Sequence, residues 1–216
     1  MSAHGQGLPA ALAIALIVAA GTVGMVAAGA RDDGRAAAAP GLRANILPPD
    51  LDGSPAPRIR LSDARGRTVD SARLAGRPYL VTFVYTRCAD VCPIVGSEIA
   101  AALERLGARA RDVAVLAVSV DPRGDTPARA RRWLGDRRLP RQAHYLLGGV
   151  RRLTPIWRDW FVVPRAGALT DPRRHDASVW LVDARGRLRG RWSGGEPIAP
   201  ADVAHDLRAL LDEAKR

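Results

Sequence analysis

The chain has 216 residues, 47% of them hydrophobic and 25% charged, a composition that excludes a fibrous or intrinsically disordered protein. Its 33 Lys and Arg residues outnumber 22 Asp and Glu residues and give a net charge of +11. The excess is arginine dispersed along the chain, and only 5% of the residues are aromatic. We therefore expect no nucleic-acid binding, and docking on an acidic protein or an anionic membrane is a second interpretation.

The N-terminal part of the chain predicts export of the remainder. Residues 1–7 form a short tail, and residues 8–30 have no charged side chain and are long enough to cross a bilayer. Their last residues, Ala28-Gly29-Ala30, also fit a signal-peptidase site, so the segment is either a transmembrane anchor or a cleaved signal. Arg31 and Arg35 favour a cytoplasmic C-terminus by the positive-inside rule, but large domains translocate largely regardless of such charges.

The predicted domain organisation follows from this segment. We expect a single-pass protein of the cell membrane with its folded domain on the extracytoplasmic side, or a secreted domain if the segment is cleaved. Residues 31–56 contain an alanine run and several prolines without apolar periodicity, which predicts a flexible linker. The remaining residues, 57–216, have a comfortable length for a single domain.

Hydrophobic periodicity predicts alternating strands and helices in this domain. The predicted elements are, in chain order, a hairpin over 59–69, a strand over 79–84, a helix over 93–106, a strand over 113–120, a helix over 126–133, a strand over 144–147, a helix over 149–161, a hairpin formed by 178–182 and 188–192, and a helix over 200–214. The two strands over 79–84 and 113–120 are apolar runs, as expected of strands buried on both faces. This order predicts an α/β protein of thioredoxin-like fold, with helices flanking a central mixed β-sheet.

The only two cysteines, Cys88 and Cys92, lie between a predicted strand and a predicted helix. Backbone N–H groups at a helix N-terminus stabilise negative charge, so we expect a thiolate to form more readily here than at a surface cysteine. Four residues apart on a helical turn, the sulfurs can converge on one metal ion or form a disulfide. A purely structural disulfide would close a very short loop and constrain little of the unfolded chain. Metal binding and thiol redox chemistry both remain open.

Two thiolates alone leave a metal site incomplete, and the chain has four histidines. His4 precedes the apolar segment, His144 falls in a predicted strand, and His205 falls in the last predicted helix. His175 follows a loop of turn residues and precedes a strand, so it is the best candidate, although a loop histidine is more often only solvated. Two thiolates and one imidazole suit Cu(I), or Cu(II) if an oxygen ligand joins, whereas structural zinc needs a fourth protein ligand that is not evident.

Three blocks of sequence then point to a family. They are 82–93 (TFVYTRCADVCP), 118–127 (VSVDPRGDTP) and 175–186, where a histidine precedes a strand and an Asp-Ala-Arg-Gly turn. On these blocks, which occur in the same order, the chain resembles the Sco/SenC family of copper-binding proteins involved in assembling the CuA centre of cytochrome c oxidase. The resemblance extends over about residues 57–214.

The resemblance implies that Cys88 and Cys92 are thiolate ligands of copper and that His175 is the imidazole ligand. Ala89 stands where the family commonly has proline, and Arg174 precedes the histidine where an aspartate is frequent. The ligands themselves are intact. Such departures can change the orientation of the imidazole or the release of copper, because groups beside the ligands tune a metal site.

The implied function is that of a metallochaperone. It would receive copper from an upstream donor protein and pass it to the CuA-bearing subunit of cytochrome c oxidase. The alternative is an enzyme, a thiol-disulfide oxidoreductase that uses Cys88 and Cys92 to reduce the cysteines of the apo CuA site, although the CxxxC spacing departs from the CxxC of thioredoxin-like enzymes. A peroxidase similar to the peroxiredoxins and a redox or copper sensor are further alternatives.

Overall fold

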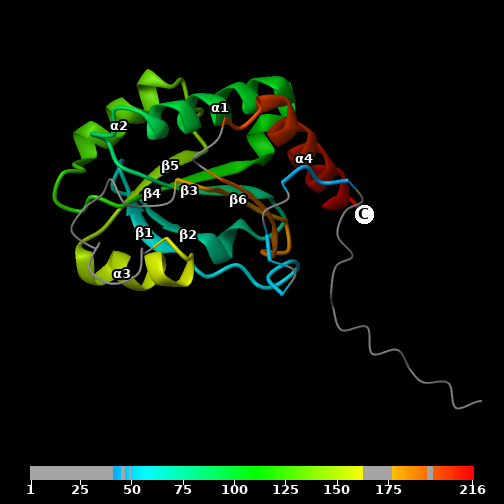
Figure 1. The fold of residues 1–216 in the computed structure, drawn as a ribbon, viewed down its shortest axis with the longest axis horizontal. Helices are drawn as coiled ribbons and strands as arrows, with labels where there is room; N and C mark the ends of the chain where they lie inside the picture. Colours follow the sequence, from blue (N-terminus) through cyan, green and yellow to red (C-terminus); the bar gives the residue numbers. More distant parts are fainter. Residues whose placement is uncertain (1–40, 45–46, 49, 163–176, 194–196) are drawn as a thin grey trace, which may run out of the picture. The chain divides into compact units, whose positions relative to one another are not determined.

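A computed structural model describes residues 41–44, 47–48, 50–162, 177–193 and 197–216 (Figure 1). These residues belong to one compact unit, Gly34–Arg216. The predicted anchor or signal over 8–30 and the predicted ligand His175 lie outside the described residues. Among the helices that are described, none is both long and apolar enough to span a membrane.

The described strands form one seven-stranded sheet in the order β2-β1-β5-β4-β3-β6-β7. Their bounds are β1 (Arg60–Asp63), β2 (Thr68–Asp70), β3 (Tyr79–Val84), β4 (Ala114–Ser119), β5 (Ala143–Leu147), β6 (Val179–Val182) and β7 (Leu188–Trp192). The central strands β3, β4 and β5 run parallel, whereas β1, β2, β6 and β7 pair antiparallel with their neighbours. The predicted central mixed sheet is confirmed.

Helices flank this sheet, as predicted. The described α-helices are α1 (Val91–Leu106), α2 (Pro127–Asp136), α3 (Val150–Asp159) and α4 (Pro200–Glu213). α1 packs against α4, and Gly96 on α1 lies against Trp133 on α2. In Figure 1, α1 and α2 lie on one side of the sheet and α3 lies on the other. Two 3-10 segments, η1 (Ser71–Leu74) and η2 (Gly107–Asp112), are absent from the prediction because such short turns carry no apolar periodicity.

The two central strands position the candidate site. Every residue of β3 and β4 is buried, which confirms that these strands are covered on both faces. Val84 at the end of β3 pairs in parallel with Ser119 at the end of β4. Because adjacent parallel strands end at the same edge of a sheet, the segments that follow them come together there. The segment after β3 carries Cys88, and the segment after β4 carries residues 121–127 of the second sequence block.

Part of the segment that is predicted as a linker packs on the domain. The backbone N–H groups of Arg43 and Ala44 donate to the fully buried carboxylate of Asp206 on α4, at 2.8 to 2.9 Å. The N–H of Gly53 donates to a backbone carbonyl of β7 at 2.8 Å. The compact unit therefore includes residues upstream of position 57.

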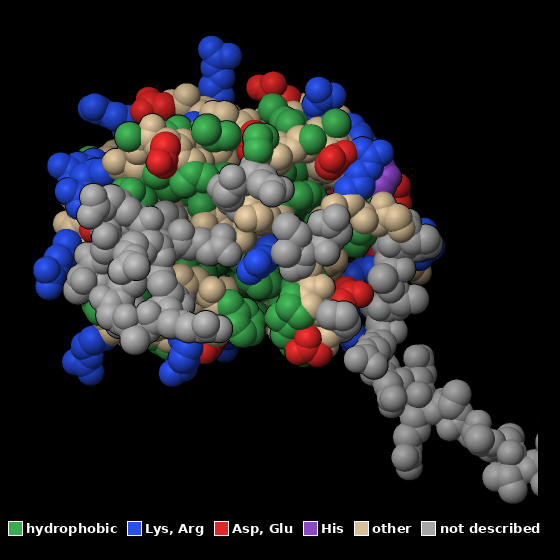
Figure 2. Space-filling model, in the orientation of Figure 1, with side chains coloured by type: hydrophobic (Ala, Val, Ile, Leu, Met, Phe, Trp, Pro, Cys, Tyr) green, Lys and Arg blue, Asp and Glu red, His purple; other side chains and the backbone are tan. Residues whose placement is uncertain are grey.

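The charged side chains are dispersed on the face that Figure 2 shows. Arginine side chains project around its rim, and Asp and Glu side chains lie between some of them. On this face, the described arginines form no continuous basic stripe of the kind that tracks a nucleic-acid backbone.

Candidate metal centre

The cysteine pair lies between β3 and α1, at the edge of the sheet where β3 ends. Cys88 is in the connecting loop, and Cys92 is in the first turn of α1. Cys88 is 7% exposed and Cys92 is completely buried. The two residues are not joined in a disulfide. The structure thus brings both predicted cysteines to one buried position.

The start of α1 brings the two sulfurs together. The backbone N–H of Cys92 donates to the Cys88 sulfur at 3.3 Å, and the two side chains are hydrogen-bonded to each other. The Cys88 thiol donates to Oδ1 of Asp90, which also caps α1 by accepting the N–H of Val91. A helix N–H directed at sulfur stabilises negative charge on it. The pair can therefore bind one soft metal ion or close a disulfide.

Burial opposes a thiolate at Cys92. It raises the pKa of the Cys92 thiol well above its ordinary value, and the hydrogen bond with Cys88 raises it further, whereas a backbone hydrogen bond from Tyr85 lowers it. The expectation that a thiolate forms readily at this helix N-terminus is therefore wrong for Cys92. Burial, followed by negative charge on Cys88, also raises the pKa of Tyr85 to about 12. A metal ion has to displace the Cys92 proton in order to bind.

Asp125, from the second sequence block, holds the cysteine loop. One of its carboxylate oxygens accepts both the backbone N–H and the hydroxyl of Thr86, at 2.8 and 2.7 Å. The other oxygen accepts the hydroxyls of Ser119 and Tyr145, at 2.6 and 2.8 Å. Because Asp125 is 9% exposed, these are buried, charge-assisted hydrogen bonds. They connect the loop before Cys88 to β4 and β5.

Arg87 and Asp121 form a second connection between the same two blocks. Nε and Nη2 of Arg87 donate to Oδ2 of Asp121 at 3.2 and 2.6 Å, and Oδ1 of Asp121 accepts the N–H of Gly124 at 2.9 Å. A Cβ atom at position 124 would lie 2.0 Å from Oδ2 of Asp121 and 2.6 Å from Nε of Arg87. Glycine is required here because the ion pair occupies the space of a side chain.

Both blocks stand out in the sequence, but the sequence by itself assigns these supporting side chains no role. The usable signal is that each block follows a strand that is buried on both faces, since such strands are often adjacent and parallel. Asp, Thr and Arg side chains at two adjacent strand ends are then within reach of one another. The adjacency of β3 and β4 cannot be read from either block alone.

The described histidines are engaged elsewhere. Nδ1 of His144 lies 3.0 Å from Asp63, and Nδ1 of His205 lies 2.9 Å from Asp206. Within the described part of the chain, no group of three or more His, Cys, Asp or Glu side chains is placed to hold a metal ion. His175 is outside that part, so its membership of the site stays a prediction.

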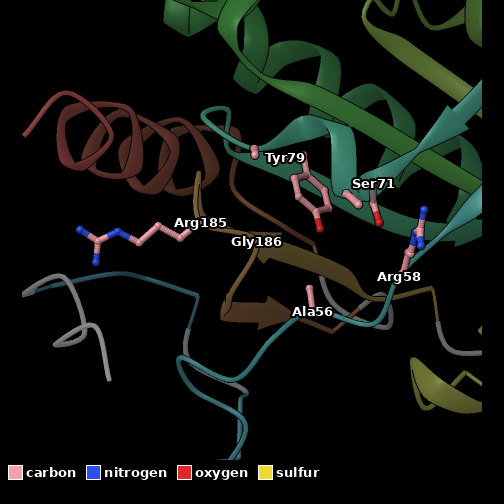
Figure 3. Close-up of a pocket in the computed structure, with 8 residues that line it drawn as sticks. Ala56, Arg58, Ser71, Tyr79, Arg185 and Gly186 are labelled. Atoms are coloured by element: carbon pink, nitrogen blue, oxygen red, sulfur yellow. The ribbon is translucent and has the colours of Figure 1, made fainter. Parts of the chain in front are cut away.

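A pocket of about 210 Å³ lies at the other end of β3 (Figure 3). Tyr79, the first residue of β3, lines it together with Arg58, Ser71 and Arg185. In Figure 3 the Arg185 side chain extends away from Tyr79, and Arg58 is ion-paired with Asp70 at 2.6 Å. The cysteines follow the opposite end of β3, so this pocket is separate from the cysteine pair.

Comparisons with known proteins agree with the three sequence blocks. The family model SCO1/SenC matches residues 54–212. The protein SenC of Rhodobacter capsulatus is 44% identical over 62 residues, which are 29% of this chain and 28% of that protein, so the match spans little more than a quarter of the relative.

Solved structures resemble the fold over a longer stretch. Bradyrhizobium japonicum ScoI, solved with copper bound, is 29% identical with a TM-score of 0.61 and covers 73% of this chain and 100% of its own. BsSco, described as a member of the Sco family of cytochrome c oxidase assembly proteins, is 21% identical with a TM-score of 0.63, covers 74% and 95%, and shows the shared fold. Because the family model extends over most of the chain, this protein belongs to the SCO1/SenC family.

Proposed function

We propose that the chain is a copper metallochaperone that assists assembly of the CuA site of cytochrome c oxidase. The observation that carries this proposal is the buried pair Cys88 and Cys92, whose sulfurs meet at the N-terminus of α1. Copper is supported by the relative that is described with copper bound. The acceptor is supported by the family description of BsSco as a cytochrome c oxidase assembly protein.

In this proposal, Cys88 and Cys92 supply two soft thiolates and His175 supplies one imidazole, a ligand set that suits Cu(I) and also holds Cu(II) with an added oxygen ligand. Copper is the cargo of the site. Cys92 releases its proton when the ion binds and regains it when the ion leaves. A site with few ligands leaves an open position at which a ligand of the acceptor can enter, so transfer proceeds by ligand exchange.

The predicted apolar segment over 8–30 would keep the domain at the extracytoplasmic face of the cell membrane, or release it after cleavage. Either arrangement places the cysteine pair outside the cytosol, where an upstream copper donor and the CuA-bearing subunit would meet it. A reporter enzyme fused to the C-terminus is expected to be active outside the cytoplasm. Activity confined to the cytoplasm would contradict export.

A thiol-disulfide oxidoreductase is the second candidate, because the adjacent sulfurs of Cys88 and Cys92 can form a disulfide. The description of BsSco names a disulfide switch in that relative. One thiolate would attack a disulfide of the apo CuA site, and the other would resolve the mixed disulfide. The target cysteines leave reduced, and the Cys88–Cys92 pair becomes oxidised.

Titration of the full-length chain with Cu(I) against a competing chelator tests the first proposal. We expect one ion per chain and binding at least about tenfold weaker in Cys88→Ser, Cys92→Ser and His175→Ala. The matched control is His205→Ala, which removes a histidine engaged with an aspartate of α4. Equal stoichiometry and affinity in Cys88→Ser and the unchanged chain would contradict the proposed site.

The His175→Ala variant also separates the two functions. We expect it to weaken copper retention while reduction of a disulfide-bonded CuA domain continues at the rate of the unchanged chain. If His175→Ala instead retained full copper affinity and the chain reduced that disulfide rapidly, the oxidoreductase would be the better account.

A further inference from the structure

Arg137 is a half-buried arginine that lies against Gly96, one turn of α1 after Cys92, and it has no ion-pair partner among the described residues. Arg137 follows the last residue of α2, and its guanidinium carbon lies 4.3 Å from the centre of the Trp133 ring. Nη1 donates to the backbone carbonyl of Trp133 at 2.9 Å, while Nε is buried and has no hydrogen-bond partner. Among the described carboxylates, none forms an ion pair with Arg137. Within the described part of the chain, no ion pair therefore neutralises the charge of this half-buried side chain.

The position of Arg137 follows from the packing of α2 on α1. A Cβ atom built at Gly96 would lie 2.5 Å from Cδ of Arg137 and 2.8 Å from the ring of Trp133. Gly96 stands four residues after Cys92, and both residues are on the buried face of α1. Residues at this spacing are helical neighbours on the order of 6 Å apart. The arginine stem thus crosses α1 one turn beyond Cys92.

The electrostatics of Arg137 are consistent with this position. Burial lowers the pKa of its guanidinium, and negative charges on Asp136, Cys92 and Cys88 act in the opposite direction. Asp136 is an exposed side chain whose field is screened by water. The cysteines are buried, so any negative charge that develops on them acts on Arg137 through a medium of low dielectric constant.

We propose that Arg137 is a specificity-determining residue that favours Cu(I) over Cu(II) at the cysteine pair. This inference rests on the proposed copper function. Two thiolates, a neutral imidazole and Cu(I) carry a net charge of −1, whereas the same ligands with Cu(II) carry none. A fixed cation close to the site attracts only the first of these states. Arg137 therefore stabilises bound Cu(I), the reduced state of the ion, relative to bound Cu(II).

The charge and the packing of Arg137 can be separated by substitution. Arg137→Met keeps an unbranched apolar stem against Gly96 and Trp133 but removes the charge, and Arg137→Lys keeps the charge. Arg132→Met is the matched control, because Arg132 is an exposed arginine on the same helix. All variants are made in the full-length chain.

The informative measurement is the ratio of Cu(I) to Cu(II) affinity, obtained from chelator competition with each ion and from the reduction potential of the bound copper. We expect Arg137→Met to lower this ratio about tenfold, which corresponds to a potential about 59 mV more negative for a one-electron couple. Arg137→Lys is expected to retain most of the ratio and Arg132→Met all of it. A loss of packing alone would weaken the binding of Cu(I) and Cu(II) equally and leave the ratio of the two affinities unchanged.

Thermal unfolding without copper provides a readout that does not depend on the metal. Arg137→Met is expected to leave the unfolding temperature of the copper-free chain unchanged or raised, because an unneutralised buried charge is removed. An unchanged affinity ratio in a folded Arg137→Met chain would overturn this inference while leaving the copper function intact. If a variant that lacks both Cys88 and Cys92 bound copper as well as the unchanged chain does, the proposed function itself would fail.

Discussion

Thr86 donates both its backbone N–H and its hydroxyl to a single carboxylate oxygen of Asp125, at 2.8 and 2.7 Å. The two residues are 39 positions apart in the sequence and come from the two blocks that follow β3 and β4. Since Thr86 precedes Cys88 by two residues, the position of the candidate site depends on a carboxylate that touches neither cysteine in any described contact.

Replacement of Asp125 by Asn is therefore expected to loosen the cysteine loop. An amide is neutral and has one acceptor oxygen instead of two, so all four donors that Asp125 satisfies lose a charged acceptor, and two of them lose their acceptor altogether. We expect the free energy of unfolding to fall by about 2 kcal/mol and Cu(I) binding to weaken. Urea unfolding and chelator competition measure the two effects. Asp136→Asn, on the exposed surface of α2, is the control and should change neither.

Gly124 offers a steric test of the connection between Arg87 and Asp121. In Gly124→Ala the new methyl group would overlap the carboxylate of Asp121, so the ion pair has to move. We expect a loss of about 2 kcal/mol of stability and weaker copper binding. Gly135→Ala is the matched control because a Cβ atom there meets nothing within 4 Å, and a helix favours alanine by up to about 1 kcal/mol. Equal behaviour of the two variants in urea unfolding would count against the role of this ion pair.

The contacts of residues 43 and 44 predict that a fragment beginning at residue 57 is less stable than one beginning at residue 34. The shorter fragment loses the backbone donors of Asp206, whose buried carboxylate would then be left under-satisfied. We expect the free energy of unfolding to differ by about 2 kcal/mol or more. In an Asp206→Asn background the difference should shrink, because no buried charge remains. Equal stability of the two fragments would show that these contacts contribute nothing.

Acid should remove the contribution of Asp70. The hydrogen bond from Arg58 lowers the pKa of Asp70 to about 2, against the effect of burial. A carboxyl whose pKa is lower in the folded than in the unfolded chain stabilises the fold at a pH above its ordinary pKa of about 4. This contribution is lost as the pH falls toward the folded-state pKa of about 2. Because Arg58 is 64% exposed, we expect Asp70→Asn to cost only about 1 kcal/mol at pH 7.

The pH dependence distinguishes this ion pair from a packing effect. The difference in unfolding free energy between Asp70→Asn and the unchanged chain should narrow steadily when urea unfolding is measured between pH 5 and pH 3. A difference that stayed constant over this range would indicate that the substitution acts through packing instead.

Local pattern was sufficient for the strands and the α-helices of the described fold, although not for its two 3-10 segments. The apolar run of β3 and the helical spacing of α1 are properties of neighbouring residues, and the structure contains both elements close to their predicted bounds. The cysteine pair could be recognised for the same reason, since both residues lie within a single strand-to-helix connection. The family resemblance, which is confirmed, also rests on short contiguous blocks.

Tertiary structure decided what surrounds the pair. The bonds of Asp125 depend on the adjacency of β3 and β4, the place of Arg137 depends on the packing of α2 on α1, and the contacts of Arg43 join residues 163 positions apart. Burial of Cys92 likewise reversed the expected effect of the helix N-terminus on its pKa. A sequence pattern reports the periodicity of one segment. Desolvation and hydrogen bonding at the cysteine pair depend on which distant segments cover it, and only the folded chain brings those segments together.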